Sequence, residues 1–129
     1  MKRPHLKRLG LTCAIGAAAL IAIPASSAKD GDVLVRGACT KASSSKLKLS
    51  EEDGRIEVEF EVDQNRNGVR WTVVLRRPAA VLVRTTRVTR GPSGSFELRR
   101  VVADLAGADR ITARATSPSG EVCRATAAF

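Results

Sequence analysis

Apolar and charged residues alternate along the segment between Arg55 and Val62. The apolar members are Ile56, Val58, Phe60 and Val62, and the charged members are Glu57, Glu59 and Glu61. Strict period-two alternation over this length predicts a β-strand with one face buried and the other in water. Residues 69–77 repeat the pattern, with Val69, Trp71, Val73 and Leu75 on the apolar parity.

Turn signals containing Gly, Pro, Asp or Ser divide the rest of the chain into further short segments. The predicted strands are residues 33–38, 46–49, 55–62, 69–77, 80–88, 95–103, 110–116 and 121–127. No segment keeps helical spacing over ten residues. Seven or eight short strands, each with one face to bury, predict an all-β fold, a single antiparallel β-sandwich. Trp71 on a middle strand favours the immunoglobulin-like class of sandwich, although cysteines in the first and last strands are not its usual placement.

The turn at residues 63–68 predicts a hairpin between the two best-patterned strands. If Val62 pairs with Val69, then Phe60 meets Trp71 and Glu61 meets Arg70, and the two apolar faces coincide. In that register Arg70 and Arg76 are the expected partners of the three glutamates.

The first 28 residues read as a cleaved signal peptide. Four basic residues precede an uncharged run of 13 residues from Leu11 to Ile23, and small residues close the segment at Ala28. That order is typical of secretory signals, and the apolar run is too short to span a membrane. We therefore expect an exported protein whose domain covers residues 29–129.

Two cysteines remain after this cleavage, because Cys13 lies in the predicted leader. Cys39 and Cys123 stand near the two ends of the domain, and an even pair in an exported chain predicts a disulfide. A bridge across 84 residues would restrict the unfolded chain by about 4 to 5 kcal/mol in the entropic description.

Cleavage also changes the side-chain inventory. The single His (His5) is lost, and the formal net charge falls from +9 to +5. A domain without His has no Ser–His pair and no His-containing zinc site, and both of its cysteines are expected to be bridged. The sequence therefore predicts a non-enzymatic protein with no cofactor.

Arginines are concentrated in the second half of the chain. The candidates for anion binding are Arg84, Arg87, Arg90, Arg99, Arg100, Arg110 and Arg114. Guanidinium groups bind phosphates and carboxylates bidentately, so a face rich in them can hold a polyanion. Most of the domain's four aromatic residues look like core, which leaves little for base stacking and argues against a nucleic-acid partner. The alternative to anion binding is that these arginines form ion pairs with acidic residues on the surface of the protein.

Two motifs that contain acidic residues are candidate sites. Residues 63–68 match the first half of a calcium loop, with Asp63, Asn65 and Asn67 as a weak metal-ligand set, but position twelve is Val74 where a Glu is needed. A hairpin turn explains the same residues, so no metal is expected. Glu57, Glu59 and Glu61 could serve a small secreted hydrolase, but alternating Glu is also the usual way to solvate a strand.

Several segments resemble a group of small secreted actinobacterial proteins of unknown function. The resemblance rests on residues 55–63, 67–71, 91–96, 107–110 and 120–123. It implies a secreted one-domain protein and supplies no activity, ligand or catalytic residue. The chain departs from the pattern at residues 78–80, a turn that a polar or Gly-containing sequence would suit better.

The sequence as a whole favours a secreted, non-catalytic binding or structural module. Its expected partner is an anionic cell-envelope polymer or another protein, held by the Arg-rich half. The alternatives are the small hydrolase above and a protease inhibitor that presents the exposed turn at residues 91–94.

Overall fold

The computed structural model describes residues 31–129. The predicted signal peptide, with Cys13 and His5, lies outside the described residues, as do residues 29–30. The described part of the chain contains no helix that could span a membrane.

The described chain folds into strands joined by turns. Its strands are β1 (Val33–Arg36), β2 (Ala38–Cys39), β3 (Ser44–Glu52), β4 (Arg55–Asp63), β5 (Arg70–Arg77), β6 (Ala80–Val88), β7 (Ser95–Ala103), β8 (Arg110–Thr116) and β9 (Val122–Ala128). Each predicted strand is present. The predicted strand 33–38 is interrupted at Gly37, and β3 is longer than the predicted 46–49.

Gly37 marks the point where the chain passes from one sheet to the other. A Cβ atom at this position would lie 2.1 Å from Ser45 Oγ and 2.8 Å from the carbonyl oxygen of Arg124. Only glycine lets the backbone approach both neighbours this closely. The first segment therefore supplies one strand to each sheet.

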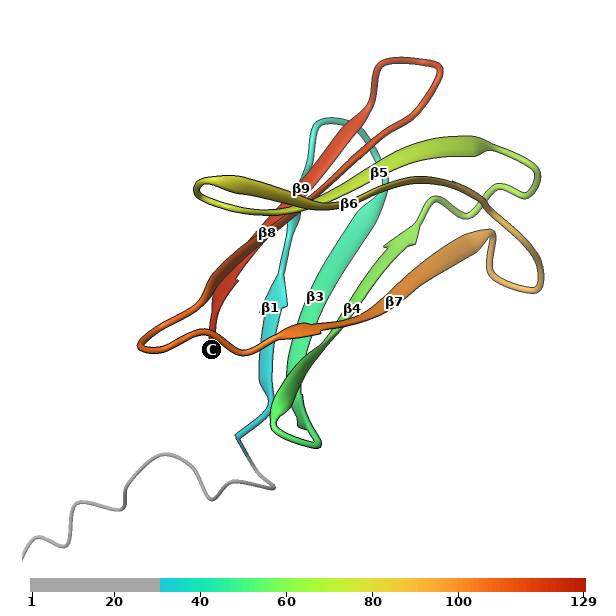
Figure 1. Ribbon diagram of the computed structural model, residues 1–129. Coiled ribbons are helices and arrows are strands. Elements are labelled where there is room, and N and C mark those ends of the chain that lie inside the picture. Colours follow the sequence, from blue (N-terminus) through green and yellow to red (C-terminus); the bar gives the residue numbers. More distant parts are fainter. Residues whose placement is uncertain (1–30) are drawn as a thin grey trace, which may run out of the picture.

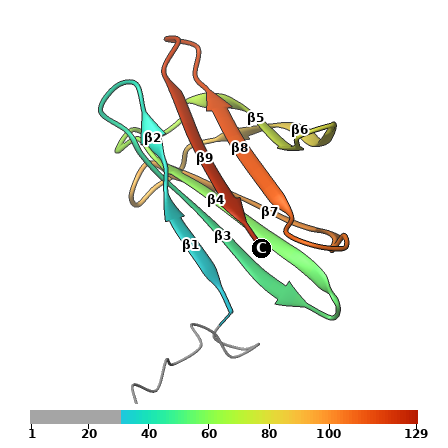
Figure 2. The same cartoon turned by 90° about the vertical axis from the view of Figure 1, so that its left-hand side faces the viewer.

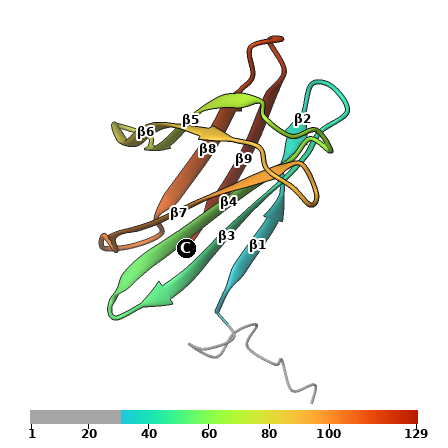
Figure 3. The same ribbon diagram turned by 90° about the vertical axis from the view of Figure 1, so that its right-hand side faces the viewer.

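Two antiparallel sheets pack face to face as a β-sandwich (Figures 1 and 2). The four-stranded sheet has the order β1-β3-β4-β7, and the five-stranded sheet has the order β2-β9-β8-β5-β6. Figure 3 shows β7, β4, β3 and β1 side by side, with β5, β8 and β9 in the other layer. The predicted all-β sandwich is confirmed, and its immunoglobulin-like class stays a prediction.

The predicted hairpin between β4 and β5 is wrong. Phe60 on β4 pairs with Leu47 and Leu98, whereas Trp71 on β5 pairs with Arg87. The two strands lie in different sheets, and residues 64–69 cross between them. Period-two alternation identifies the buried face of a strand. It does not identify the neighbour, because apolar faces also coincide when two strands oppose each other across a sandwich.

The inward faces of both sheets form one core. Phe60 and Leu47 from one sheet and Trp71 and Leu75 from the other are fully buried. The rings of Trp71 and Phe96 lie 6.0 Å apart between centroids and are tilted by 53°. The Trp71 indole N–H donates to Gln64 Oε1 at 3.1 Å, so its polar atom is satisfied.

The predicted disulfide is present between Cys39 and Cys123, which are directly opposite each other on β2 and β9. Their Cα atoms are 4.1 Å apart. The bridge lies within the five-stranded sheet, unlike the immunoglobulin bridge, which joins the two sheets. It fastens the short β2 to the last strand of the chain.

Two buried carboxylates fasten the loops at the ends of the sandwich. Glu121 accepts hydrogen bonds from the backbone N–H groups of Lys41 and Ser43, at 3.1 and 3.0 Å. Asp109 accepts from Arg77 Nε at 2.9 Å and from the Leu105 N–H at 2.6 Å. Both acids are therefore accounted for by structural roles.

Candidate functional site

Charge is divided unequally between the two sheets. The strands of the five-stranded sheet contain eight arginines and no acidic residue. The strands of the four-stranded sheet contain seven acidic and six basic residues. One layer is thus strongly basic, and the other is close to neutral.

Six of the eight arginines lie on the outer surface of the five-stranded sheet, because side chains alternate along a strand. This arginine face consists of Arg70, Arg76, Arg84, Arg110, Arg114 and Arg124, all exposed. Between them lie the threonines Thr72, Thr86, Thr112, Thr116 and Thr126. Arginine and threonine carry hydrogen-bond donors, so the face is suited to acceptor-rich ligands.

A hollow of about 430 Å³ lies on the arginine face. Its lining residues are Thr72, Val74, Arg76, Arg84, Thr112, Arg114, Thr116 and Arg124. All eight project from the outer side of β5, β6, β8 and β9. The strand alternation therefore gathers four guanidinium groups around one shallow depression.

These four arginines have no ion pair and no side-chain hydrogen bond with another residue of the described range 31–129. In that range, basic groups that form ion pairs belong to Lys46, Lys48, Arg77 and Arg99. The positive charge of the hollow is therefore not neutralised by described parts of the protein. Clustered charge of one sign raises the local concentration of counter-ions.

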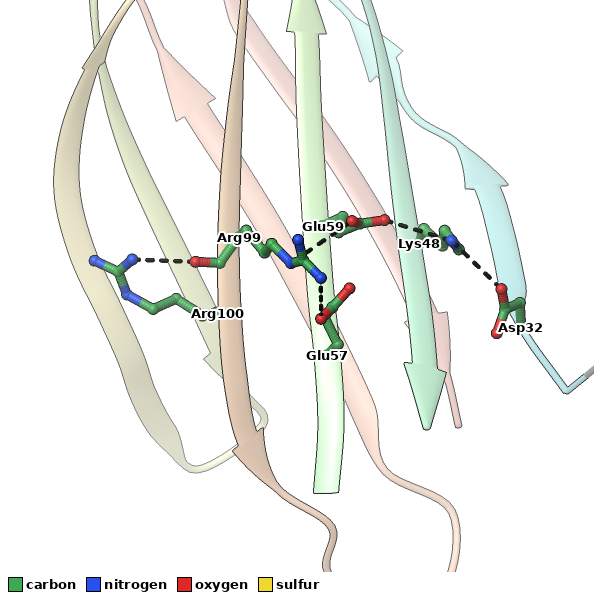
Figure 4. A network of polar contacts seen from close by, with 6 residues as sticks. All are labelled: Asp32, Lys48, Glu57, Glu59, Arg99 and Arg100. Carbon is green, nitrogen blue, oxygen red and sulfur yellow. Dashed lines mark hydrogen bonds and ion pairs between the residues drawn. The ribbon is translucent and has the colours of Figure 1, made fainter. Parts of the chain in front are cut away.

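The outer surface of the four-stranded sheet is neutralised by its own ion pairs (Figure 4). Lys48 Nζ lies 3.4 Å from Asp32 Oδ2 and 3.6 Å from Glu59 Oε2. Arg99 lies 2.6 Å from Glu57 Oε2 and 3.8 Å from Glu59 Oε1. The pKa of Lys48 is raised, chiefly by its hydrogen bond to Asp32 and then by the charge of Glu59. This face already contains its own counter-charges.

The predicted ion-pair partners of Glu57, Glu59 and Glu61 are not the observed ones. Arg70 and Arg76 lie on β5 in the opposite sheet, and the observed partners are Lys46, Lys48 and Arg99 on β3 and β7. Glu57 is also buried, contrary to the expectation of a fully solvated acidic face. Both differences follow from the position of β4 in the middle of its sheet.

The seven predicted anion-binding arginines do not form one group. Arg84, Arg110 and Arg114 lie on the arginine face. Arg99 is paired with Glu57 on the other sheet, and Arg100 donates to the Arg99 carbonyl. Arg87 lies on the inward parity of the edge strand β6, and Arg90 lies in the loop after it.

Sequence reasoning missed Arg70, Arg76 and Arg124. The signal for them was available, because the polar parities of residues 70–76, 110–116 and 122–128 carry Arg and Thr and contain no acid. When the outward positions of a strand carry Arg but no Asp or Glu, the strand has no acidic side chain of its own to offset the positive charge. That pattern, more than the number of arginines in half of the chain, marks the face.

The residues of the weak calcium candidate form a turn. Asp63 Oδ1 accepts the Asn65 N–H at 3.0 Å, and Asn65 adopts a left-handed conformation with φ of 55°. The Gln64 N–H donates to the Gly94 carbonyl, which joins this turn to the turn between β6 and β7. A Cβ atom on Gly94 would lie 2.2 Å from Arg66 N, so the two turns are in close contact.

A second arrangement of potential metal ligands lies near the disulfide. Within residues 31–129, ligand atoms of Cys39, Cys123 and Glu121 come within 4.8 Å of one another. Both sulfur atoms are committed to the disulfide, and Glu121 accepts hydrogen bonds from residues 41 and 43. These three residues therefore have a structural role, which is to hold β2 and residues 41–43 in place.

Comparison with protein-family models, with curated proteins and with solved structures finds no match to this chain.

Proposed function

We propose that the protein is a non-catalytic binding module that holds an anionic polymer of the cell envelope on its arginine face. The observation that carries the proposal is the hollow with four guanidinium groups that no described residue neutralises. A polymer with repeated negative groups can contact several of them at once.

The contrast between the two sheets supports a ligand on this particular face. Alternating Glu, Lys and Arg neutralise the four-stranded sheet through pairs such as Lys48–Glu59 and Arg99–Glu57. The five-stranded sheet could have been neutralised in the same way, since its strands also alternate buried and outward side chains. Instead its strands contain no acid, which leaves their positive charge available to external anions.

Two further observations support action by binding outside the cytoplasm. The carboxylates of Glu57 and Glu59 are engaged by Arg99 and Lys48, which leaves them poorly placed for acid–base work. The Cys39–Cys123 bridge is compatible with an extracellular protein, because disulfides persist in oxidising compartments. Export itself rests on the predicted leader at residues 1–28.

Binding to heparin over a range of salt concentrations tests the proposal. Four arginine contacts imply an affinity that falls on the order of a hundredfold between 50 and 200 mM salt, as counter-ions compete for the same charges. The triple variant Arg84→Gln/Arg114→Gln/Arg124→Gln should lose most of the affinity at low salt. Titration calorimetry measures both effects.

A second triple variant separates this face from net charge. Arg55, Arg66 and Arg100 are exposed arginines outside the arginine face, so their replacement by Gln removes the same three charges. This control should bind heparin nearly as the unaltered protein does. No binding at low salt, or equal losses in the two triples, would contradict the proposal.

A further inference from the structure

Arg114 and Arg124 are direct cross-strand neighbours on the arginine face, on β8 and β9. Directly opposite residues of antiparallel strands have Cα atoms about 4.5 to 5.5 Å apart. The same row continues through Val74 on β5 to Arg84 on β6. Arg84 thus lies two strands from Arg114, at about 10 Å.

An opposed pair of like charges destabilises a sheet unless something lies between them. The other sheet contains such a pair, Glu61 opposite Glu97, and there Lys46 Nζ lies 3.6 Å from Glu61. Within residues 31–129, Arg114 and Arg124 have no comparable counter-ion. We therefore expect a ligand to supply the negative charge that offsets the repulsion between Arg114 and Arg124.

The pair also restricts the type of anion. Each guanidinium presents two parallel N–H groups that match an edge formed by two oxygen atoms. A carboxylate or a phosphodiester has two terminal oxygens and thus one such edge. A sulfate ester or a phosphate monoester has three terminal oxygens, so two guanidinium groups can each take a different edge.

Threonine hydroxyls flank the pair and add donors. Thr112 and Thr116 stand on either side of Arg114 along β8, and both line the hollow. The Thr112 and Thr126 hydroxyl oxygens are 2.9 Å apart and share a hydrogen bond. The Thr116 hydroxyl can donate to the third oxygen of a group held between the two arginines.

We propose that the hollow selects a polysaccharide bearing sulfate esters or phosphate monoesters, and that the Arg114–Arg124 pair determines this selectivity. This inference rests on the proposed function and specifies its ligand. One such group occupies the pair, and Arg84 contacts the next group along the polymer, which runs across the strands.

Three dextrans of matched length and charge density test the selectivity: dextran sulfate, dextran phosphate with monoester groups, and carboxymethyl-dextran. Calorimetry at one salt concentration should show the sulfate or the phosphate polymer bound about tenfold more tightly than the carboxylate polymer, the effect of about one additional charge-assisted hydrogen bond. The tighter-binding polymer of these two shows which of the two ester groups the hollow favours.

A charge-conserving double variant, Arg114→Lys/Arg124→Lys, tests the role of the forked geometry. It should reduce the preference over carboxymethyl-dextran to less than about twofold, because lysine binds as a point charge. The matched control Arg55→Lys/Arg100→Lys should keep the preference.

The outcomes separate the two proposals. Equal affinity for all three dextrans, or a preference that survives the double lysine variant, would overturn the selectivity and leave polyanion binding in place. No affinity for any of the three at low salt would overturn both.

Discussion

Arg77 and Asp109 are 32 residues apart in the chain, yet they form the most enclosed ion pair among the described residues. Arg77 Nε lies 2.9 Å from Asp109 Oδ1, and both side chains are nearly inaccessible to solvent. Arg77 also donates to the Ala103 carbonyl. The pair joins the end of β5 to the loop between β7 and β8.

The hydrogen bond from Arg77, followed by that from the Leu105 N–H, holds the pKa of Asp109 below its ordinary value of 3.8. Because the folded-state pKa is the lower one, the ionised carboxylate contributes stability that is fully present above the unfolded-state pKa. This contribution is lost as the pH falls through the folded-state pKa. Acid should therefore weaken this end of the sandwich below about pH 4.

Asp109→Asn should lower the free energy of unfolding near neutral pH by about 2 kcal/mol, since hydrogen bonds to a charged group are lost. The difference in Tm between the variant and the unaltered protein should shrink as the pH is lowered from 6 to below about 4. Calorimetric Tm values across this range measure it. Asp53→Asn, at an exposed turn, serves as the control, and a pH-independent difference would contradict the assignment.

At the scale of elements, β2 is too short to hold itself in place. It consists of Ala38 and Cys39, and its ladder to β9 has two residue pairs. The disulfide and the hydrogen bonds that Glu121 accepts from residues 41 and 43 fasten the same region. The bridge therefore stabilises the edge of the sheet that carries the arginine face.

Cys39→Ser should destabilise the protein by about 2 to 4 kcal/mol, because the unfolded chain gains the entropy of an open 84-residue loop and disulfides typically deliver less than the full entropic value. Urea unfolding with and without a reductant measures the effect. The reductant should lower the midpoint of the unaltered protein and leave that of the variant unchanged. Equal midpoints for the oxidised protein and the variant would show that the bridge contributes no stability.

At the scale of the whole molecule, charge is segregated between the two layers. The outer surface of the four-stranded sheet carries alternating signs, as the Asp32–Lys48–Glu59–Arg99 series in Figure 4 shows. On the outer surface of the five-stranded sheet, the charged side chains of the described strands are all arginines. Because opposed like charges are destabilising, repulsion within the arginine face lowers the free energy of unfolding. A bound polyanion would offset this loss.

Arg114→Thr should therefore stabilise the ligand-free protein at low salt, by about 0.5 kcal/mol, and the gain should shrink near 1 M salt as charges are screened. Arg99→Thr is the opposite case, because it leaves the buried Glu57 without its partner and should destabilise. Thermal unfolding at the two salt concentrations compares them. A loss of stability for Arg114→Thr at low salt would contradict the like-charge argument.

Local patterns determined the positions of the strands and, for β4 and β5, the parity that is buried. The alternation of Ile56, Val58 and Phe60 with glutamates identified a half-buried strand, since side chains on a strand alternate between two faces. Two cysteines at the ends of the domain predicted the bridge, and Pro and Gly placed the turns. These features depend on neighbours in the sequence, so they could be read without the tertiary structure.

Only the tertiary structure decided which strands are neighbours, and with that which charges meet. The alternation in β4 and β5 was also compatible with a hairpin between them. In the structure β4 pairs with β3 and β7, and its glutamates form ion pairs with Lys48 and Arg99. The pairing of β8 with both β5 and β9 brings Arg76, Arg114 and Arg124 to one hollow from distant segments. Alternation along a strand determines which face of the sheet a side chain lies on. Strand order determines which side chains are its neighbours, and it depends on contacts between residues far apart in the chain.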